Sequence, residues 1–353
     1  MRTVLVPLDI DPGLPPAACR RRQLAGSTMG TSWSVHLMQP AGVAADLQSA
    51  LERELDQIVA QMSHWAPDSL LSIYNAAPGG SWHALPPQFF EVIDYALQVA
   101  QDSGGAFDPA AGDIVELWGF GSGLGAGARY DQPDFYAPSP AAVANLFARR
   151  PHALARPGTY ALLDRARRRL LQPGGVVLDL SAVAKGYAVD RLALCLERHG
   201  VRHYLVEIGG ELRGAGVKED GQPWWVEVEG VPDAAGGSGG SGDSRQQPVV
   251  ALHGLAIATS GDYRRYFRQA RRRVPHTLDP RSGQPIANGL ASVTVLAKTC
   301  MQADALSTAL TVLGPQAGMA FAEARALAAR FLLRADDGSL AESTSPAWQA
   351  LLQ

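Results

Sequence analysis

The sequence is short of cysteine, of long apolar runs and of net positive charge. Its 353 residues include only three cysteines, Cys19, Cys195 and Cys300, which form no CxxC pair, so we expect neither a zinc site nor a disulfide framework. The sequence contains no run of about 18 apolar residues, the length needed to indicate a membrane span. The 31 basic and 34 acidic residues give a net charge of -3, so a nucleic-acid partner, which requires a basic surface, is not expected.

The first residues do not resemble a secretion signal. Asp9, Asp11 and four prolines interrupt their apolar positions, and the arginines 20–22 follow this segment, whereas a signal has its positive charge before the apolar stretch. The segment Ala17–Cys19 resembles a lipoprotein cleavage site only superficially. We therefore expect a cytoplasmic protein.

The sequence does contain a mixture of helical and strand periodicities. Apolar residues spaced by three and four predict helices over 45–63, 87–105, 139–150, 181–200, 300–314 and 318–330. Short alternating or apolar runs predict strands over 26–38, 159–164, 168–172, 176–180, 203–216, 224–230, 248–259, 292–297 and 331–343. Because strands and helices do not alternate regularly, the sequence predicts an α+β fold with mixed or antiparallel sheets flanked by helices.

One domain is expected to follow an extended N-terminal lead. Residues 1–24 predict the lead, and residues 25–353 predict a single domain with two lobes. The glycine- and serine-rich segment 233–247 predicts a flexible insertion between two strands that pair as a hairpin. Its composition favours tolerance of insertion over a chemical role.

A carboxylate and a hydroxyl are placed to form a metal site in the helix expected from residue 300. Thr299 and Gln302 fit a capping box, so Asp304 and Thr308 lie one turn apart on one helix face. Two oxygen ligands near a positive helix terminus suit Mg²⁺ with phosphate oxygens in its shell. Such pairs are common, and the alternative is a polar stripe that faces solvent.

A second candidate site lies where the apolar run 176–180 meets a helix. Asp179 lies near the end of this run, Ser181 is a candidate N-cap, and Lys185 falls in the first helical turn. The helix terminus and the ammonium together attract an anion such as a diphosphate, while Asp179 can accept hydrogen bonds from a base or ribose. The alternative is an ordinary capped helix whose lysine extends into water.

Two further segments place chemically active or aromatic residues in loops. His276 has the Asp279 carboxylate nearby, and such a pair can act as a general base, although in a loop it is more often structural. Phe107 and Trp118 in a glycine-flanked segment, with Trp65 elsewhere, are placed to stack on a planar ligand. Core packing is the alternative for each of these aromatic residues.

Seven segments, in order, carry a likeness to known proteins. They read GSTMGTSWSV, MSHWAPDSLLSIYN, SGGAFDPAAGDIVELWGFG, LDLSAVAKGYAVDRL with LVEIGGELRGAG, AIATSGDYRRYF, HTLDPRSGQPI and CMQADALSTALTVLG. Together they resemble the ApbE family, the FAD:protein FMN transferases, over roughly residues 25–325. Each segment is moderately specific by itself, and seven in family order are not expected by chance.

The resemblance implies an ApbE-like fold and an enzyme that transfers FMN from FAD, through its phosphate, to a Thr or Ser hydroxyl of a target protein and releases AMP. It implies Mg²⁺ bound by Asp304, Thr308 and the backbone carbonyl of Ala182. It also implies that His276 takes the proton of the acceptor hydroxyl. The positions that match FAD contacts in the family are Met29, Trp65, Ala106, Phe107, Asp108, Asp179, Lys185 and Thr277.

The resemblance further implies a protein partner. The acceptor motif of the family, D-G-x-[S/T]-G-A-T, does not occur in this chain, so we expect the hydroxyl to come from another protein that carries such a motif. Two alternatives stay open. One is a FAD pyrophosphatase that uses water and yields FMN and AMP, and the other is a FAD-binding protein without turnover.

Overall fold

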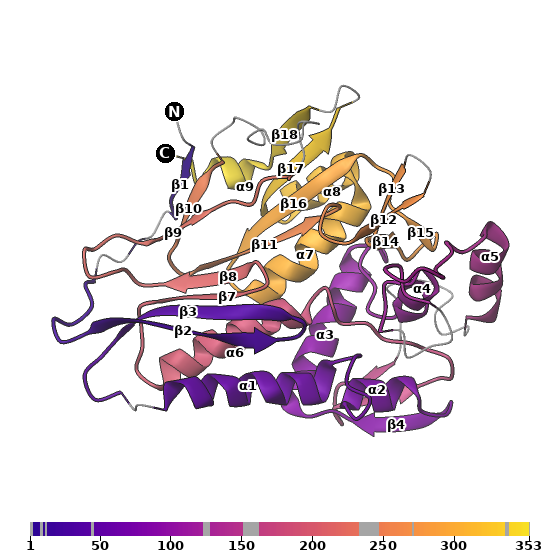
Figure 1. Cartoon of the computed structure of the whole chain (residues 1–353), viewed down its shortest axis with the longest axis horizontal. Coiled ribbons are helices and arrows are strands. Elements are labelled where there is room, and N and C mark those ends of the chain that lie inside the picture. Colours follow the sequence, from indigo (N-terminus) through magenta and orange to yellow (C-terminus); the bar gives the residue numbers. More distant parts are fainter. Residues whose placement is uncertain are drawn as a thin grey trace.

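The computed structural model describes residues 3–7, 10, 13–43, 46–122, 128–150, 162–232, 247–269, 272–335 and 339–352. At its centre is an eight-stranded antiparallel sheet with the order β18-β17-β16-β11-β8-β7-β3-β2 (Figure 1). Its strands are β2 (Arg20–Thr28), β3 (Thr31–Gln39), β7 (Tyr204–Ile208), β8 (Glu211–Ala215), β11 (Leu255–Gly261), β16 (Leu290–Ala297), β17 (Ala328–Arg334) and β18 (Leu340–Thr344).

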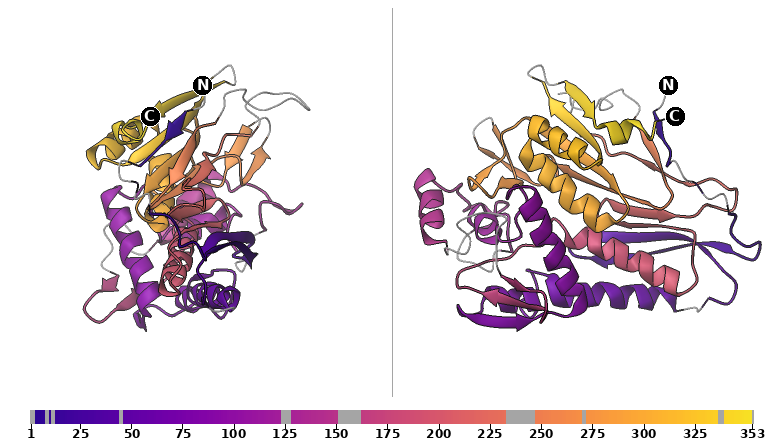
Figure 2. Two further views of the ribbon diagram at one scale, coloured as in Figure 1. Left: turned by 90° about the vertical axis from the view of Figure 1, so that its left-hand side faces the viewer. Right: turned by 180° about the vertical axis from the view of Figure 1, so that it is seen from behind.

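Helices pack against this sheet and against one another. α6 (Ala184–Arg198) contacts β7 and β8, α7 (Cys300–Leu313) contacts β11 and β16, and α8 (Pro315–Ala324) contacts β17. α1 (Leu47–Met62) packs on α6, and α3 (Pro87–Asp102) contacts both α1 and α7. From behind, these helices lie in front of the sheet (Figure 2).

Smaller sheets and short helices surround this core. The smaller sheets contain β1 (Val4–Leu5), β10 (Val249–Leu252) and β9 (Trp224–Glu227); β4 (Ser81–Ala84), β6 (Arg169–Gln172) and β5 (Leu163–Asp164); β12 (Tyr266–Gln269) and β13 (Arg272–Pro275); and β14 (Leu278–Asp279) and β15 (Gln284–Pro285). The short helices are α2 (Leu70–Asn75), α4 (Gly112–Leu117), α5 (Pro140–Arg149) and α9 (Pro346–Gln349). The predicted α+β class is confirmed.

The largest hydrophobic core lies between α1, α3, α6 and the strands β3 and β7. Leu51, Leu55 and Ile58 follow one another on α1 at spacings of four and three and are almost completely buried in it. This spacing predicted the helix, because it places all three side chains on one face. A second cluster, which includes Leu310 and Phe331, joins α7 and α8 to β16 and β17.

The strand predicted over 176–180 is wrong, because its backbone groups bond to side chains and loops instead of to a neighbouring strand. The side-chain amide of Asn75 accepts from the Leu178 N–H at 2.8 Å and donates to the Leu178 carbonyl at 2.9 Å. The Asp179 N–H donates to the Pro109 carbonyl at 2.8 Å. An apolar run therefore marked a buried segment here but not a sheet strand.

Two predicted helix termini also differ from the structure. α6 begins at Ala184 with Val183 as its N-cap, and the Ser181 N–H donates to the Asp179 carboxylate at 2.7 Å, so Ser181 is not the cap. The helix predicted over 318–330 ends at Ala324. Ala326 then takes a positive φ of 50°, a conformation that ends helices, and β17 follows.

The sequence also missed elements near turn signals. α2 and α4 lie in segments for which the sequence predicts no helix. The first strand of the main sheet starts at Arg20, inside the segment expected to be a lead, and β1 pairs with β10. The predicted pairing of the strands around the insertion is confirmed by the antiparallel pair of β9 and β10, while residues 233–246 lie outside the described part of the chain. The division at residues 24 and 25 stays a prediction.

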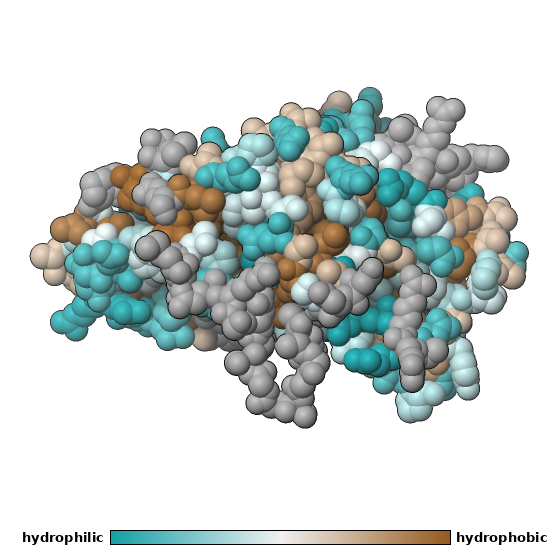
Figure 3. All heavy atoms as spheres, turned by 90° about the horizontal axis from the view of Figure 1, so that it is seen from above, coloured by the Kyte–Doolittle hydropathy of each residue, from teal (hydrophilic) through white to brown (hydrophobic). Residues whose placement is uncertain are grey.

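The described residues contain no helix that is both long and apolar enough to cross a membrane. Seen from above, the surface mixes hydrophilic residues with separate smaller hydrophobic patches (Figure 3).

Candidate active site

A charged cluster of two buried carboxylates and a half-buried lysine lies where α6, α7 and β8 meet. Lys185, the second residue of α6, donates from its Nζ to the Glu211 Oε1 at 2.5 Å. Burial lowers the pKa of Lys185, but the Asp304 and Glu211 carboxylates outweigh it and raise this pKa above its ordinary value. Burial raises the pKa of Glu211 to about 7, with Asp304 adding to the rise and Lys185 opposing it. Lys185 therefore carries positive charge at neutral pH. We call Lys185, Glu211 and Asp304 the charged cluster.

Asp304 is held against the start of α6 by a close helix crossing. The Gly186 N–H donates to the Asp304 Oδ2 at 2.9 Å, and the Asp304 residue is only 5% exposed. A Cβ at Gly186 would lie 2.3 Å from the Cys300 carbonyl oxygen and 2.8 Å from the Asp304 Cβ. Glycine is therefore required for α7 to approach α6 this closely. Ala182 lies in the turn that leads into α6.

One turn further along α7, hydroxyl groups add to the oxygen atoms that could ligate a metal ion. The Oγ1 of Thr308 lies 2.9 Å from the Oγ of Ser260 at the end of β11, and the Ser307 hydroxyl also reaches Ser260, at 3.4 Å. The predicted placement of Asp304 and Thr308 on one helix is confirmed, and both belong to α7. Neither side chain lies on a solvent-facing stripe, because Asp304 is buried and Thr308 is half-buried.

The donor set fits a hard divalent cation. It consists of a carboxylate and hydroxyls, the oxygen ligands that Mg²⁺ prefers, and the neighbouring Glu211 Oε2 is buried without a hydrogen-bond partner among the described residues. No group of three or more His, Cys, Asp or Glu side chains in the described ranges could hold a metal by itself. A bound ion would thus depend on Thr308 and on backbone or phosphate oxygens besides Asp304.

His276 directly follows β13, and the charge of Lys185 in the charged cluster acts on its pKa. Its Nδ1 lies 3.0 Å from the Arg265 carbonyl, which can only accept, so Nδ1 carries the proton and Nε2 is the free acceptor. Burial lowers the pKa of His276 to about 4, against the effect of its hydrogen bond to Arg265. The positive charges of Arg265, Lys185 and Arg264 add to the lowering. His276 is therefore neutral, and able to take a proton, at neutral pH.

The carboxylate that the sequence placed beside His276 has another partner. Asp279 binds the guanidinium of Arg281 at 2.8 and 2.9 Å within the tight turn between β14 and β15. The histidine is oriented instead by a backbone carbonyl. Asp279 is therefore not the partner of His276 in this structure.

A second group, the aromatic wall, lies on the loops around Asp179. The His64 Nδ1 is 3.9 Å from the Asp179 Oδ1, and the His64 and Trp65 rings lie 5.3 Å apart. Trp65 is 42% exposed, and the guanidinium of Arg129 lies 4.9 Å from its ring centre. We use the name aromatic wall for His64, Trp65, Arg129 and Asp179. Three residues, Trp65, Phe107 and Trp118, were predicted to stack on a planar ligand. Of these, Trp65 is the one whose ring is exposed.

The other two predicted stacking residues are core residues. Phe107 is 4% exposed and belongs to the main hydrophobic core. The indole N–H of Trp118 donates to the Gly283 carbonyl at 2.8 Å, and its ring lies near that of Phe267. Core packing therefore accounts for both side chains. Contacts from the segment 106–108 to a ligand would have to come from its backbone or from Asp108.

The segment that follows α3 is tied to the segment that precedes α6. Ala106 and Asp108 are buried, and the Asp108 Oδ1 accepts from the Ala110 N–H at 2.8 Å. The Gly112 N–H donates to the Val177 carbonyl at 3.0 Å. Together with the bond between Asp179 and Pro109, this brings the predicted residues 106–108 next to Asp179.

Met29 and Thr277 are the two remaining residues that the family resemblance predicts to contact FAD. Met29 and Gly30 form the turn between β2 and β3 with positive φ values of 49° and 72°. The adjacent strand contacts the Gly209 turn, because the Gly209 N–H donates to the Ser32 carbonyl at 3.2 Å. Thr277 is buried beside His276. Both positions therefore connect to elements that carry the charged cluster or His276.

The sequence reading missed three residues that the structure connects to these groups. Glu211 follows the Gly209–Gly210 turn and pairs with Lys185. Arg264 donates to the Gly209 carbonyl at 2.6 Å and to Glu229 at 2.5 Å, and His64 pairs with Asp179. The only available signal was for Glu211, an acidic residue that follows the strand β7 and two glycines. For Arg264 and His64 the partners lie far away in sequence.

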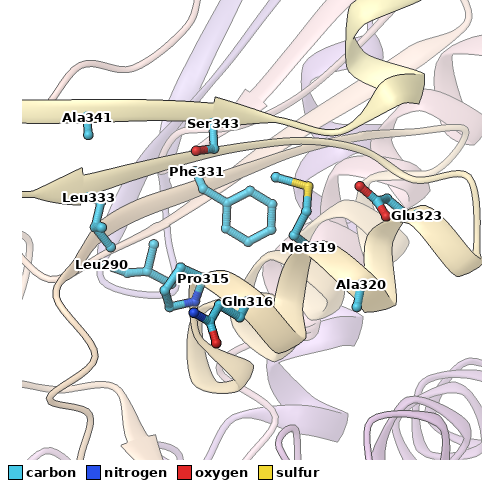
Figure 4. Close-up of a pocket in the computed structure, with 10 residues that line it drawn as sticks. All are labelled: Leu290, Pro315, Gln316, Met319, Ala320, Glu323, Phe331, Leu333, Ala341 and Ser343. Atoms are coloured by element: carbon cyan, nitrogen blue, oxygen red, sulfur yellow. The ribbon is translucent and has the colours of Figure 1, made fainter.

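A separate hollow of about 480 Å³ lies between α8 and the strands β17 and β18. Figure 4 shows Met319 of α8 and Phe331 of β17 side by side within it. Its ten described lining residues are mostly apolar and include none of the predicted site residues. This hollow therefore contains none of the residues to which the sequence analysis assigns a chemical role.

The fold, with two carboxylates and a lysine gathered at the start of α6, is that of the flavin transferases. A crystal structure of the flavinyl transferase ApbE from Pseudomonas stutzeri superimposes with a TM-score of 0.80 at 36% identity, covering 96% of this chain and 98% of that one. The flavin transferase ApbE from Vibrio cholerae gives a TM-score of 0.80 at 32% identity, covering 95% and 100%. The model of the ApbE family matches residues 29–331. The chain belongs to the ApbE family.

Curated relatives agree with this assignment. A FAD:protein FMN transferase from Vibrio cholerae is 37% identical over 318 residues, 89% of this chain and 88% of the relative. A protein of the same name from Salmonella typhimurium is 32% identical over 340 residues, 95% of this chain and 91% of the relative.

Proposed function

We propose that this chain transfers FMN from FAD to a Ser or Thr hydroxyl of another protein and releases AMP. The observation that carries the proposal is the charged cluster at the start of α6, whose Lys185 helps to lower the pKa of His276 and keep it neutral. The names of the relatives, FAD:protein FMN transferase, support the same activity.

The chemistry requires neutralised phosphate charge, a positioned hydroxyl and a base. Lys185 and the N-terminus of α6 attract the diphosphate of FAD. Asp304, Thr308 and the Ala182 carbonyl would hold Mg²⁺, and a bound ion would supply positive charge that neutralises phosphate oxygens. Nε2 of His276 takes the proton of the acceptor hydroxyl. The hydroxyl oxygen then bonds to the phosphorus on the flavin side, and the bond from that phosphorus to the bridging oxygen breaks, so that AMP leaves with the bridging oxygen.

The remaining predicted residues contact the rest of FAD in this proposal. Asp179 accepts hydrogen bonds from the ligand, and Trp65 stacks on a planar ring. The further contacts are Met29, Ala106, Phe107, Asp108 and Thr277. The acceptor is a protein with a D-G-x-[S/T]-G-A-T-like motif, and the cytoplasmic location expected from the first residues stays a prediction.

Mass spectrometry of an acceptor peptide tests the proposal. The protein is incubated with FAD, Mg²⁺ and a peptide that contains the motif, and we expect a mass gain of one FMN on the peptide together with one AMP released. A matched peptide with Ala at the Ser or Thr position should gain no mass. AMP and FMN without an adduct would favour the pyrophosphatase, and bound FAD without AMP would favour a binding protein.

A further inference from the structure

The segment that leads to His276 concentrates positive charge. Residues 263–276 include six arginines and no acidic residue, in a chain whose net charge is -3. Most of them lie on or beside the hairpin of β12 and β13, which ends at Pro275, directly before His276. Such a local excess creates a field that favours an anionic partner.

The register of this hairpin opposes like charges. Arg268 pairs with Arg273 across the two strands, and like charges directly opposite one another destabilise a strand pair. Arg273 is partly compensated, because its Nη1 lies 3.6 Å from the Asp262 carboxylate and its guanidinium lies over the Tyr266 ring at 4.3 Å. The arrangement is therefore less unfavourable when an anion lies next to Arg268.

The arginines divide into fixed and available ones. Arg264 is fixed by Glu229 and by the Gly209 carbonyl. Arg265 and Arg268 are exposed, and neither has an acidic partner within 4.0 Å in the described ranges. Arg265 does lower the pKa of Asp131, but that carboxylate is bound by Arg129 at 2.9 Å.

The available arginines lie beside the proposed base. The carbonyl of Arg265 accepts the hydrogen bond that orients His276, so this surface borders the place where an acceptor hydroxyl must lie. We propose that Arg265 and Arg268 dock an acidic segment of the acceptor protein next to the hydroxyl that receives FMN. This inference rests on the proposed function, and it specifies in addition that the acceptor protein carries negative charge near its hydroxyl. A protein acceptor is favoured over nucleic acid or membrane, because the proposed function transfers FMN to a Ser or Thr hydroxyl, and only a protein carries these side chains.

Paired acceptor peptides test the docking surface. Both contain the acceptor motif, and it is flanked by four glutamates in one and by four glutamines in the other. At low salt we expect kcat/KM to be about tenfold higher for the glutamate peptide, since complementary charge mainly speeds association. The preference should shrink towards one as salt rises. The Arg265→Glu, Arg268→Glu double variant should reverse it, and Arg268→Glu alone should reduce it. Each preference is the ratio of the kcat/KM values of one enzyme for the two peptides. A general loss of catalysis lowers both values equally and therefore cancels.

A matched variant controls for net charge. Arg20→Glu, Arg202→Glu changes two exposed arginines at the far ends of β2 and β7 from the Met29 and Gly209 turns, and it should keep the preference. Equal rates for both peptides in the unchanged protein would overturn the docking proposal. Loss of the preference in the control variant as well would overturn it too.

A binding measurement separates this proposal from the proposed function. If neither peptide gains FMN, the transferase proposal fails, and fluorescence anisotropy of the same labelled peptides decides the docking. Tighter binding of the glutamate peptide that is lost in Arg265→Glu, Arg268→Glu supports the surface. Equal binding of the two peptides contradicts the docking proposal. Binding of duplex DNA or phosphatidylserine vesicles through Arg265 and Arg268, in place of the peptides, also contradicts it.

Discussion

The charged cluster and the aromatic wall are built in opposite ways. Lys185, Glu211 and Asp304 lie on helices and a strand, are tied by short hydrogen bonds, and surround a close crossing at Gly186. The aromatic wall lies on loops, leaves Trp65 exposed, and contains a longer 3.9 Å contact between His64 and Asp179. Groups that act on phosphate need fixed geometry in a low-dielectric site, whereas a stacking surface can tolerate adjustment. Substitutions in the cluster should therefore have large effects, and those in the wall small ones.

Asp304→Ala should have the largest effect. It removes the proposed carboxylate ligand and the acceptor of the Gly186 N–H. We expect FMN transfer to fall by more than about 100-fold, since groups behind a metal ligand already contribute about 10- to 100-fold. Asp304→Asn is the matched control, because it keeps an acceptor for Gly186 but loses the charge. Full transfer by both variants at limiting Mg²⁺ would remove Asp304 from the metal site.

His276→Ala should lower transfer by about 10²- to 10⁴-fold, the usual contribution of a general base, with FAD binding retained. The pH profile sharpens this prediction. Because burial lowers the pKa of His276 to about 4, its neutral form is present above that pH, and kcat/KM should fall only as pH drops through about 4. Circular dichroism at each pH excludes unfolding as the cause. An acid limb near pH 6.5, the ordinary histidine value, would contradict the assigned environment.

Gly186→Ala tests the helix crossing on which the charged cluster depends. Alanine normally favours a helix, but here its Cβ meets the Cys300 carbonyl, and overpacking of this kind costs about 1–3 kcal/mol. We expect a lower free energy of unfolding in urea and weaker Mg²⁺ dependence of transfer. Gly200→Ala is a comparison without a steric clash, since nothing lies within 4 Å of its Cβ position, although its φ of 80° strains the backbone. Unchanged stability of Gly186→Ala would show that α7 can move away.

Trp65→Ala should have the smallest effect. Loss of one exposed stacking partner corresponds to about 0.5–1.5 kcal/mol, so KM for FAD should rise less than about tenfold while kcat changes little. Trp65→Phe should restore most of the affinity. A fall in kcat as large as that of His276→Ala would erase the distinction between wall and cluster.

Local patterns account for what could be predicted from the sequence. The apolar spacing of Leu51, Leu55 and Ile58 predicted α1, and the fixed spacing of Asp304 and Thr308 placed both on one face of α7. Long-range partners could not be predicted in this way. Glu211 reaches Lys185 only because β8 lies beside α6, and the backbone of 176–180 bonds to Asn75, about a hundred residues earlier. Periodicity reports which side chains are buried, but not which distant group satisfies them.

A crystal structure grown with FAD and Mg²⁺ tests the proposed chemistry most directly. We expect Asp304, Thr308 and the Ala182 carbonyl to ligate the ion at about 2.0–2.1 Å, with the diphosphate of FAD between the ion and Lys185. FAD bound in the hollow between α8 and β17, or an ion held without Asp304 and Thr308, would contradict it.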